Sequence, residues 1–201
     1  MPSLACSTRE LVARLQAGEA AIFPTDTLPA LATRPESAEL LWELKQRPPK
    51  KPVILMAAEA SDLLACVQLE IQPAWQQMAD QYWPGALTLV LPARGQWLEQ
   101  LNPGGTTLGL RVPACEKARE LLRQSGPLAT TSANLSGQPS CLTQEEASLA
   151  FPQVAQLGPN PWPVHGGVGS TVIEWMPSGH WKLLRAGVLM PPELGEAASS
   201  A

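Results

Sequence analysis

A short run of cations is the first feature of this sequence that could do chemistry. Lys45, Arg47, Lys50 and Lys51 fall within seven residues and are interleaved with prolines. Cations near the end of a helix gain from its dipole, so a solvated basic turn is one interpretation. The prolines stiffen the segment, however, and stiff cations suit a triphosphate, because arginine can fork onto two phosphate oxygens. The run by itself leaves both interpretations open.

A single arginine, Arg111, stands within the otherwise apolar stretch at residues 108–112. A buried guanidinium without a partner is very costly, so Arg111 must either meet an acidic side chain or face a cavity. An internal salt bridge is the common outcome. A substrate carboxylate is the sharper alternative, because the planar fork of arginine matches a carboxylate with two hydrogen bonds.

Hydroxyl side chains follow a predicted buried strand near the start of the chain. Thr25, Asp26 and Thr27 come after the apolar residues 20–23, and ligands of α/β proteins bind where strands end. Two hydroxyls and a carboxylate at this point could hold a small polar substrate and even a metal. They could equally stabilise a turn by bonding their own backbone.

A second polar group, at residues 130–137, lies where another predicted strand gives way to a loop. Its Ser132 and Asn134 could bond neighbouring backbone groups, or they could help to cradle a ribose, a base or a phosphate. Ser170 and Arg185 add polar positions at two further strand ends. Such a set of cations and hydroxyls is expected to act by positioning and charge stabilisation, as phosphoryl and adenylyl transfer require.

Other kinds of chemistry have little support in the sequence. The two histidines, His165 and His180, fall in loop-like segments, so no nucleophile is paired with a sited base. The four cysteines never approach a C-x-x-C spacing, which argues against a structural zinc site. Neither a G-x-G-x-x-G segment after a strand nor a P-loop lysine is present. A nucleotide must therefore be held by other means.

The elements that position these residues alternate unevenly between helix and strand. Ser7 is expected to cap the first helix, with Glu10 completing a capping box and Gly18 following its end. This pattern predicts an α/β fold, a single domain with a twisted mixed sheet and flanking helices. Periodicity and turn residues place further helices at 37–45, 61–69, 73–82, 115–124 and 143–151, and strands at 20–23, 53–58, 86–92, 108–112, 128–131, 170–174 and 181–185.

Composition bounds the class of protein. The 201 residues are 45% hydrophobic and 16% charged, as in globular domains, and the net charge of −4 argues against a surface that coats a nucleic acid. We find no signal-like start and no apolar run near the roughly 20 residues of a spanning helix, so no membrane partner is expected. The scattered cysteines fit a reducing cytoplasm. We expect one domain over 7–190 and a flexible tail over 191–201.

Seven short motifs, in their order along the chain, resemble those of the YrdC/TsaC family. Residues 24–28 resemble its P-T-D-T-V segment, residues 45–47 its K-x-R signature and residues 132–134 its S-x-N signature. The remaining motifs are W-P-G-x-x-T at 83–88, L-R-x-P at 110–113, S-T-V at 170–172 and L-R-x-G at 184–187. Each motif is weak alone, but the ordered set covers about residues 18–187 and is specific.

The resemblance implies the family's fold, a YrdC-like twisted sheet with a concave basic face. It also implies a nucleotidyltransferase activity, threonylcarbamoyl-AMP synthase, in which L-threonine, bicarbonate and ATP give threonylcarbamoyl-adenylate and pyrophosphate. Mg²⁺ would accompany the triphosphate, with no organic cofactor and no protein-bound metal site. A tRNA threonylcarbamoyl-transferase complex would then use the product to modify adenosine in tRNA.

The same resemblance assigns roles to individual residues. Lys45 and Arg47 would be catalytic, and Arg111 would bind the carboxylate of threonine. The full sets are Lys45, Arg47, Ser132, Asn134 and Arg185 for ATP, and Thr27, Arg111 and Ser170 for threonine.

The chain departs from the family pattern at one pair of positions. Pro29 and Ala30 stand where the family continues with Tyr-Gly, so an aromatic ring is lost and proline fixes a backbone angle. The alternative to an enzyme is a non-catalytic YrdC-like module that binds double-stranded RNA through its concave face. A carbamoyl-transfer relative of hydrogenase-maturation proteins is a third option, which the missing acylphosphatase and zinc-finger segments argue against.

Overall fold

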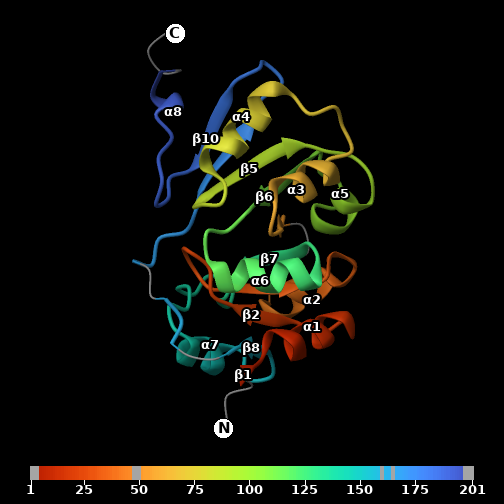
Figure 1. Ribbon diagram of the computed structural model, residues 1–201, viewed down its shortest axis with the longest axis vertical. Helices are drawn as coiled ribbons and strands as arrows, with labels where there is room; N and C mark the ends of the chain where they lie inside the picture. Colours follow the sequence, from red (N-terminus) through yellow and green to blue (C-terminus); the bar gives the residue numbers. More distant parts are fainter. Residues whose placement is uncertain (1–4, 47–50, 159–160, 164–165, 197–201) are drawn as a thin grey trace.

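The structure, a computed structural model, describes residues 5–46, 51–158, 161–163 and 166–196 (Figure 1). In this part of the chain a mixed sheet of ten strands has the order β1-β8-β2-β3-β7-β4-β6-β5-β9-β10. The predicted α/β fold with a mixed sheet is therefore confirmed. The strands are β1 (Ala5–Cys6), β2 (Ala21–Phe23), β3 (Ala30–Thr33), β4 (Ile54–Met56), β5 (Leu87–Pro92), β6 (Thr107–Arg111), β7 (Leu128–Ser132), β8 (Ala155–Leu157), β9 (Thr171–Trp175) and β10 (Trp181–Arg185).

Short helices cover both faces of the sheet (Figure 1). They are α1 (Thr8–Gln16), η1 (Pro35–Ser37, a 3₁₀ turn), α2 (Glu39–Leu44), α3 (Ala60–Cys66), α4 (Pro73–Tyr82), α5 (Gln96–Leu101), α6 (Glu116–Ser125), α7 (Gln144–Ala150) and α8 (Glu193–Glu196). None of these described helices has the length and apolar character needed to cross a membrane.

Local chemistry explains the best-predicted boundaries. Ser7 caps α1, because its hydroxyl accepts from the Glu10 N–H at 3.4 Å while a Glu10 carboxylate oxygen accepts from the Ser7 N–H at 2.9 Å. Pro73 opens α4 at the position where its missing N–H does no harm. The predicted helix at 61–69 ends early, at Cys66, since Gln68 adopts a left-handed conformation with φ +53°.

Five elements were not predicted, namely β1, β3, β8, α5 and α8. Each has six residues or fewer, too few for a periodic pattern to emerge. The helix expected at 37–45 is also divided, into η1 and α2. These short elements are stabilised by their neighbours, as when β8 pairs in parallel with both β1 and β2.

The alternation of side chains along the central strands separates a packed face from an open one. Leu55, Leu110 and Ala129 belong to the larger apolar core, which α2, α3, α4 and α5 cover. On the opposite face, α1 and α6 pack side by side over the β2, β3 and β8 region. Ile54 and Thr130, one residue along from the core positions, point to this second face. The part of that face over β4 to β9 lies beyond the two helices.

The segment predicted as a flexible tail begins with a short helix. In α8, Glu193 accepts a hydrogen bond from the Tyr82 hydroxyl at 2.8 Å, and Leu194 packs against the core. Residues 197–201 lie outside the described residues, so the proposed domain boundary at residue 190 stays a prediction. All four cysteines lie in the described part, and none forms a disulfide.

Candidate functional site

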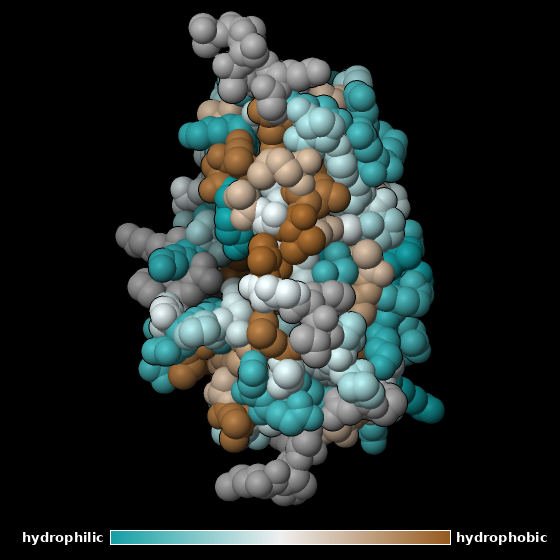
Figure 2. All heavy atoms as spheres, turned by 90° about the vertical axis from the view of Figure 1, so that its left-hand side faces the viewer, coloured by the Kyte–Doolittle hydropathy of each residue, from teal (hydrophilic) through white to brown (hydrophobic). Residues whose placement is uncertain are grey.

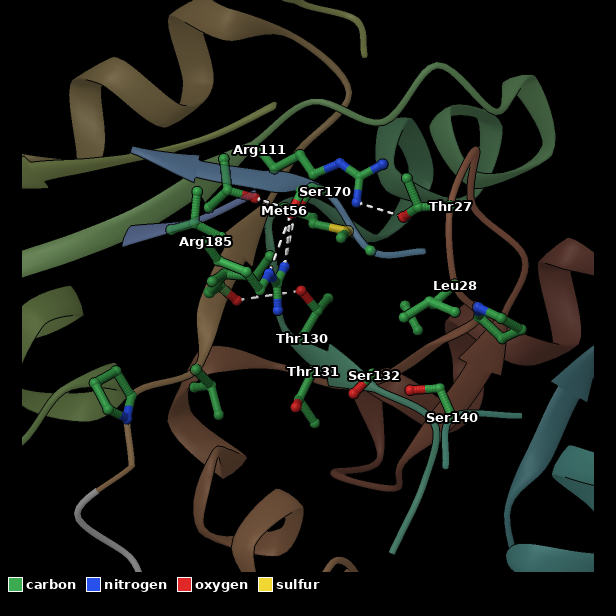
Figure 3. Close-up of a pocket in the computed structure, with 18 of the residues that line it drawn as sticks. Thr27, Leu28, Met56, Arg111, Thr130, Thr131, Ser132, Ser140, Ser170 and Arg185 are labelled. Carbon is green, nitrogen blue, oxygen red and sulfur yellow. Dashed lines mark hydrogen bonds between the residues drawn. The ribbon is translucent and has the colours of Figure 1, made fainter. Parts of the chain in front are cut away.

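A cavity of about 360 Å³ opens on the uncovered part of the sheet face (Figure 3). This volume is in the range of small-molecule sites. Its floor is formed by side chains in the middle of strands, so the cavity lies over a face of the sheet and not only at strand ends, where the sequence had placed it. The lining residues are Thr27, Leu28, Pro29, Ala30, Pro52, Val53, Ile54, Met56, Thr88, Arg111, Thr130, Thr131, Ser132, Ser140, Gly169, Ser170, Val172, Arg185 and Ala186.

Arg111 forms one end of the cavity and is only 3% exposed. Its Nη1 donates to the Thr27 hydroxyl at 2.8 Å, its Nη2 to Asp26 Oδ1 at 2.8 Å, and its Nε to the Gly85 carbonyl at 3.0 Å. Both outcomes expected for a buried arginine are therefore combined: an internal ion pair with Asp26, and a guanidinium that lines the cavity. Burial lowers the pKa of Arg111, with a smaller contribution from Arg185, whereas Asp26 opposes that shift.

Thr27 reaches this arginine because the residues after β2 form a side-chain-stabilised turn. The buried Thr25 hydroxyl accepts from the Thr27 N–H at 3.1 Å and donates to the Leu28 carbonyl at 2.8 Å. The two interpretations of this segment, a stabilised turn and a substrate site, thus apply to different residues. Thr25 holds the turn, while Thr27 faces the cavity.

A second polar group surrounds Ser170. The buried hydroxyls of Ser170 and Thr88 are 2.8 Å apart and share a hydrogen bond. Arg185 donates to the Ser170 carbonyl from Nη2 at 2.9 Å and contacts the Ser170 hydroxyl at 3.3 Å (Figure 3). Gly187 lies against the backbone of residues 169–171, where a side chain would collide. Arg185 is consequently held at the cavity wall by the segment that precedes β9.

Lys45 takes a different place from the one the sequence suggested. It is 3% exposed and does not line the cavity. Its ammonium donates to the Ser132 carbonyl at 2.6 Å, the Asn134 carbonyl at 2.7 Å and Asn134 Oδ1 at 3.0 Å. The amide nitrogen of Asn134 donates in turn to the carbonyls of Leu135 and Gln138. Lys45 therefore connects the end of α2 to the loop after β7.

The structure brings together five of the eight residues assigned to the site: Thr27, Arg111, Ser132, Ser170 and Arg185 line the cavity. Lys45 and Asn134 contact Ser132 from behind it. Arg47 lies outside the described residues. The cavity also contains Thr88, Met56 and Ser140, to which the sequence analysis gave no role. Thr88 had a visible signal, since it is the one polar residue in an apolar strand.

The cavity is lined by few charged side chains, and those in the described part are basic. No Asp or Glu stands among the described residues that line the cavity, and Asp26 beside it is bonded to Arg111. On the outer surface, Arg14, Arg34 and Arg123 are each paired with a glutamate. Among the described residues that line the cavity, Arg111 and Arg185 carry the positive charge. His180 is exposed, as expected for a turn residue.

Exposed apolar side chains neighbour several lining residues in the sequence. Val168, Leu184 and Val188 are about half exposed, and they are close in sequence to Gly169, Arg185 and Ala186 of the lining. The Val188 N–H also donates to the Gly169 carbonyl at 3.1 Å. Figure 2 shows apolar side chains gathered on this side of the molecule.

The departure at residues 29 and 30 is compatible with the fold. Pro29 precedes β3, so its missing N–H removes no bond from the sheet, and its carbonyl accepts from the Ala133 N–H at 2.9 Å. Ala30 then pairs with Ser132. Both residues line the cavity, where they present an aliphatic wall.

Known proteins resemble this chain over most of its length. The threonylcarbamoyl-AMP synthase of Mus musculus is 31% identical over 194 residues, an alignment that covers 89% of this chain and 66% of the mouse protein. The threonylcarbamoyl-AMP synthase of Idiomarina loihiensis is 38% identical over 134 residues, covering 64% of this chain and 72% of that protein.

A solved structure agrees with these relatives. Sua5 of P. abyssi, determined in complex with L-threonine, superposes with a TM-score of 0.85 at 30% identity, covering 94% of this chain and 56% of the Sua5 chain. This chain thus spans just over half of Sua5 and about two thirds of the mouse protein. The family model described as "Telomere recombination" (Sua5, YciO and YrdC) matches residues 13–187. With that match over most of the chain, and a cavity built from its shared motifs, the chain belongs to the Sua5/YciO/YrdC family.

Proposed function

We propose that this protein is a threonylcarbamoyl-AMP synthase, which forms threonylcarbamoyl-adenylate and pyrophosphate from L-threonine, bicarbonate and ATP. The observation that carries the proposal is the buried Arg111 guanidinium at the wall of a cavity that is otherwise lined by hydroxyls. Two relatives with this name and a threonine complex of Sua5 support the choice of reaction.

Threonine is assigned to the Arg111 end of the cavity. Three of the five N–H groups of Arg111 donate to Gly85, Thr27 and Asp26, which leaves two for a carboxylate. Binding there satisfies a buried cation that would otherwise keep unused donors, and charge-assisted hydrogen bonds of this kind are about twice as strong as neutral ones. Ser170 and Thr88 supply hydroxyls within the same cavity for the rest of the amino acid.

ATP is assigned to the side that Arg185, Thr131 and Ser132 line. Arg185 is the second cation of the cavity, and its fork is suited to phosphate oxygens. The exposed Val168 and Val188 beside it would cover a face of the adenine base. Lys45 and Asn134 hold the Ser132 loop in place from behind, and Arg47 stays a prediction of the sequence.

The reaction needs placement and charge stabilisation more than a protein nucleophile. The amine of threonine adds to carbon dioxide derived from bicarbonate and loses a proton, giving a carbamate. A carbamate oxygen then attacks the α-phosphorus of ATP as the bond to pyrophosphate breaks. Arg185 would stabilise the negative charge of the phosphates, and Arg111 would keep the amine near them. Such preorganised donors cost little reorganisation when the charge develops.

Mg²⁺ is expected to arrive with the triphosphate. The described residues fit a dedicated magnesium cage poorly: none of the cavity-lining ones is a carboxylate, and no group of three or more His, Cys, Asp or Glu gathers in the part that the structure covers. Magnesium usually keeps several waters and is held by substrate phosphates together with one or two carboxylates, so the phosphates would be its main ligands here. No step of the proposed reaction is therefore assigned to a metal bound by this chain.

The product would serve tRNA modification. We place the protein in the cytoplasm, with a tRNA threonylcarbamoyl-transferase complex as the partner that consumes the adenylate. Direct contact with tRNA stays a prediction from the resemblance. The ion pairs of Arg14, Arg34 and Arg123 reduce the positive field available for it.

A turnover assay tests the proposal. Purified protein is incubated with ATP, Mg²⁺, threonine and bicarbonate, and pyrophosphate and the adenylate are quantified. We expect both products only when all substrates are present. Pyrophosphate release that does not depend on threonine, or no release at all, would contradict the proposed function. Binding of RNA with a steep salt dependence and without turnover would favour the RNA-binding alternative.

A further inference from the structure

Asp26 lies just outside the cavity and touches its most buried cation. Oδ1 of Asp26 accepts from Arg111 Nη2 at 2.8 Å and from the backbone N–H of Ala114 at 2.9 Å. The side chain is 16% exposed, and that of Arg111 is 3% exposed. One carboxylate oxygen is thus fixed by the backbone and by the guanidinium together.

This arrangement connects two segments that are distant in sequence. Asp26 belongs to the turn after β2, while Arg111 and Ala114 lie at the end of β6 and just beyond it. The register of the sheet does not bring these ends together, because β6 pairs through β4 with the start of β7, whereas β2 pairs through β3 with its end. The contacts of Asp26 and Thr27 with Arg111 hold the turn across the face of the sheet.

The bonding pattern also sets the direction of the guanidinium. Gly85, Thr27 and Asp26 each engage a different nitrogen of Arg111, so the plane of the fork is fixed by three points. Without Asp26, the Nη2 end would lose its anchor, and the fork could turn about the bonds that remain. A planar fork recognises a carboxylate only when its remaining N–H groups point toward it.

We propose that Asp26 is a positioning residue that aims the Arg111 fork at the substrate carboxylate and so selects amino acids with a free carboxylate. The proposal rests on the function given above. Asp26 itself does not contact the substrate. It acts through Arg111, and its second role is to hold Thr27 at the cavity by fixing the turn.

Asp26→Ala and Asp26→Asn separate positioning from charge. The alanine variant loses the oxygen that accepts both hydrogen bonds. The asparagine variant keeps the shape and one oxygen that can accept from Arg111 and Ala114, but it lacks the negative charge. Glu19→Ala serves as the matched control, because it removes an ion pair of the same 2.8 Å length, Arg14 to Glu19, from the exposed surface.

The readout is the preference of the protein for L-threonine over L-threoninamide, measured by calorimetric titration. The amide is uncharged at the carbonyl end, so the ratio of the two dissociation constants reports recognition of the carboxylate. We expect the dissociation constant of the amide divided by that of threonine to fall at least about tenfold in Asp26→Ala, the size of one good charge-assisted contact. In Asp26→Asn and Glu19→Ala this ratio should stay within about threefold of the wild-type value. In turnover, the threonine KM should rise in Asp26→Ala while the ATP KM is unchanged.

The possible results are distinguishable. An unchanged ratio in a folded Asp26→Ala variant, or a rise of the ATP KM equal to that for threonine, overturns the positioning role and leaves the proposed function intact. A wild-type protein that binds neither ligand overturns both. Should Asp26→Ala not fold, as judged by thermal unfolding, Asp26→Ser takes its place. Serine keeps a hydroxyl in the turn, but its oxygen is one bond closer to the backbone than Oδ1 of Asp26 and carries no charge, so the same tenfold fall is expected.

Discussion

The ammonium of Lys45 lies 2.7 Å from the carbonyl oxygen of Asn134, a residue 89 positions later in the chain. The ammonium also donates to the Ser132 carbonyl, at the end of β7, and to Asn134 Oδ1. The Ser136 N–H completes the connection by donating to the Lys45 carbonyl at 3.0 Å. Two of the family's signatures, K-x-R and S-x-N, are therefore joined to each other directly, and Ser132 reaches the cavity from this joint.

Replacing Lys45 should reduce both stability and turnover. Lys45→Ala removes the ammonium that donates to the Asn134 carbonyl, which costs about 1–3 kcal/mol for a buried group left unsatisfied. The Ser132 carbonyl still accepts from the Asn134 N–H at 3.0 Å. Turnover should fall about 10²-fold, the scale for a misplacement of about 1 Å at a reacting group, because Ser132 loses the ammonium that holds it at the cavity. Denaturant unfolding and pyrophosphate release measure the two effects. The control is Lys182→Ala, a change at an exposed lysine of β10, which should leave both unchanged. Wild-type turnover in Lys45→Ala would falsify any role of this lysine in the reaction.

Arg111→Lys tests whether the site needs a fork or only a charge. Lysine retains a cation but presents its donors from one point, so it cannot bond Gly85, Thr27 and Asp26 in the directions that Arg111 does. We expect the threonine KM to rise at least about tenfold, equal to about 1.4 kcal/mol, with little change in the ATP KM. Steady-state kinetics with each substrate varied in turn gives both values. A lysine variant with the wild-type threonine KM would show that charge alone suffices.

The hydroxyl pair of Thr88 and Ser170 predicts a non-additive effect on stability. Ser170→Ala leaves the Thr88 hydroxyl, which is 1% exposed, without its 2.8 Å partner, at a cost of about 1–3 kcal/mol. Thr88→Val removes the same bond from the Ser170 hydroxyl, which keeps its 3.3 Å contact with Arg185 Nη2, so this change should cost less. The double variant removes both polar groups, so its stability should be closer to wild type than the sum of the two changes. Unfolding of all four proteins in a double-mutant cycle measures the coupling.

Activity should not follow stability in this cycle. The double variant still lacks the Ser170 hydroxyl at the cavity, so its threonine KM should stay raised even where its stability recovers. A double variant that regains both properties would indicate that the pair serves packing only.

The sequence predicted the elements that carry strong local signals. The capping box of Ser7 and Glu10 predicts the start of α1, and Pro73 predicts the start of α4. Both signals depend only on residues a few positions apart. The central apolar strands were also found. By contrast, β3 and β8 depend on pairing with strands far away in sequence, and no local pattern reports such pairing.

The site was predicted in its residue types but not in its geometry. Arg111 was recognised as a cation in an apolar strand, but the sequence could not decide between an internal ion pair and a ligand site. In the structure Arg111 does both, because it bonds Asp26 and also lines the cavity. Lys45 was assigned to ATP through the K-x-R signature of the family that the chain resembles, whereas the basic run around it left two interpretations open. Its burial behind Ser132 depends on the loop after β7 and could not be read from that run. Thr88 and Met56 enter the cavity only because the strands align them.

The alkaline limit of stability should depend in part on Tyr82. Burial raises the pKa of Tyr82 to about 12, and the nearby Glu193, whose carboxylate accepts from the hydroxyl at 2.8 Å, adds to the shift. The unfolded chain releases this proton near its ordinary value of about 10, whereas the folded protein keeps it. The unfolded state therefore binds fewer protons between these values, and stability falls as the pH rises from about 10 to about 12. This contribution is fully present below pH 10.

Tyr82→Phe should accordingly flatten the dependence of the free energy of unfolding on pH in that window. The contact between α4 and α8 is lost in this variant, so its stability at pH 7 should be slightly lower while its decline above pH 10 is smaller. Glu193→Gln should lower the Tyr82 pKa toward its ordinary value and give an intermediate slope. Urea unfolding at pH 8, 10 and 11 measures the effect for the three proteins. Equal slopes above pH 10 in wild type and Tyr82→Phe would show that α8 does not protect this hydroxyl, because a phenol that ionises alike in both states contributes no dependence on pH.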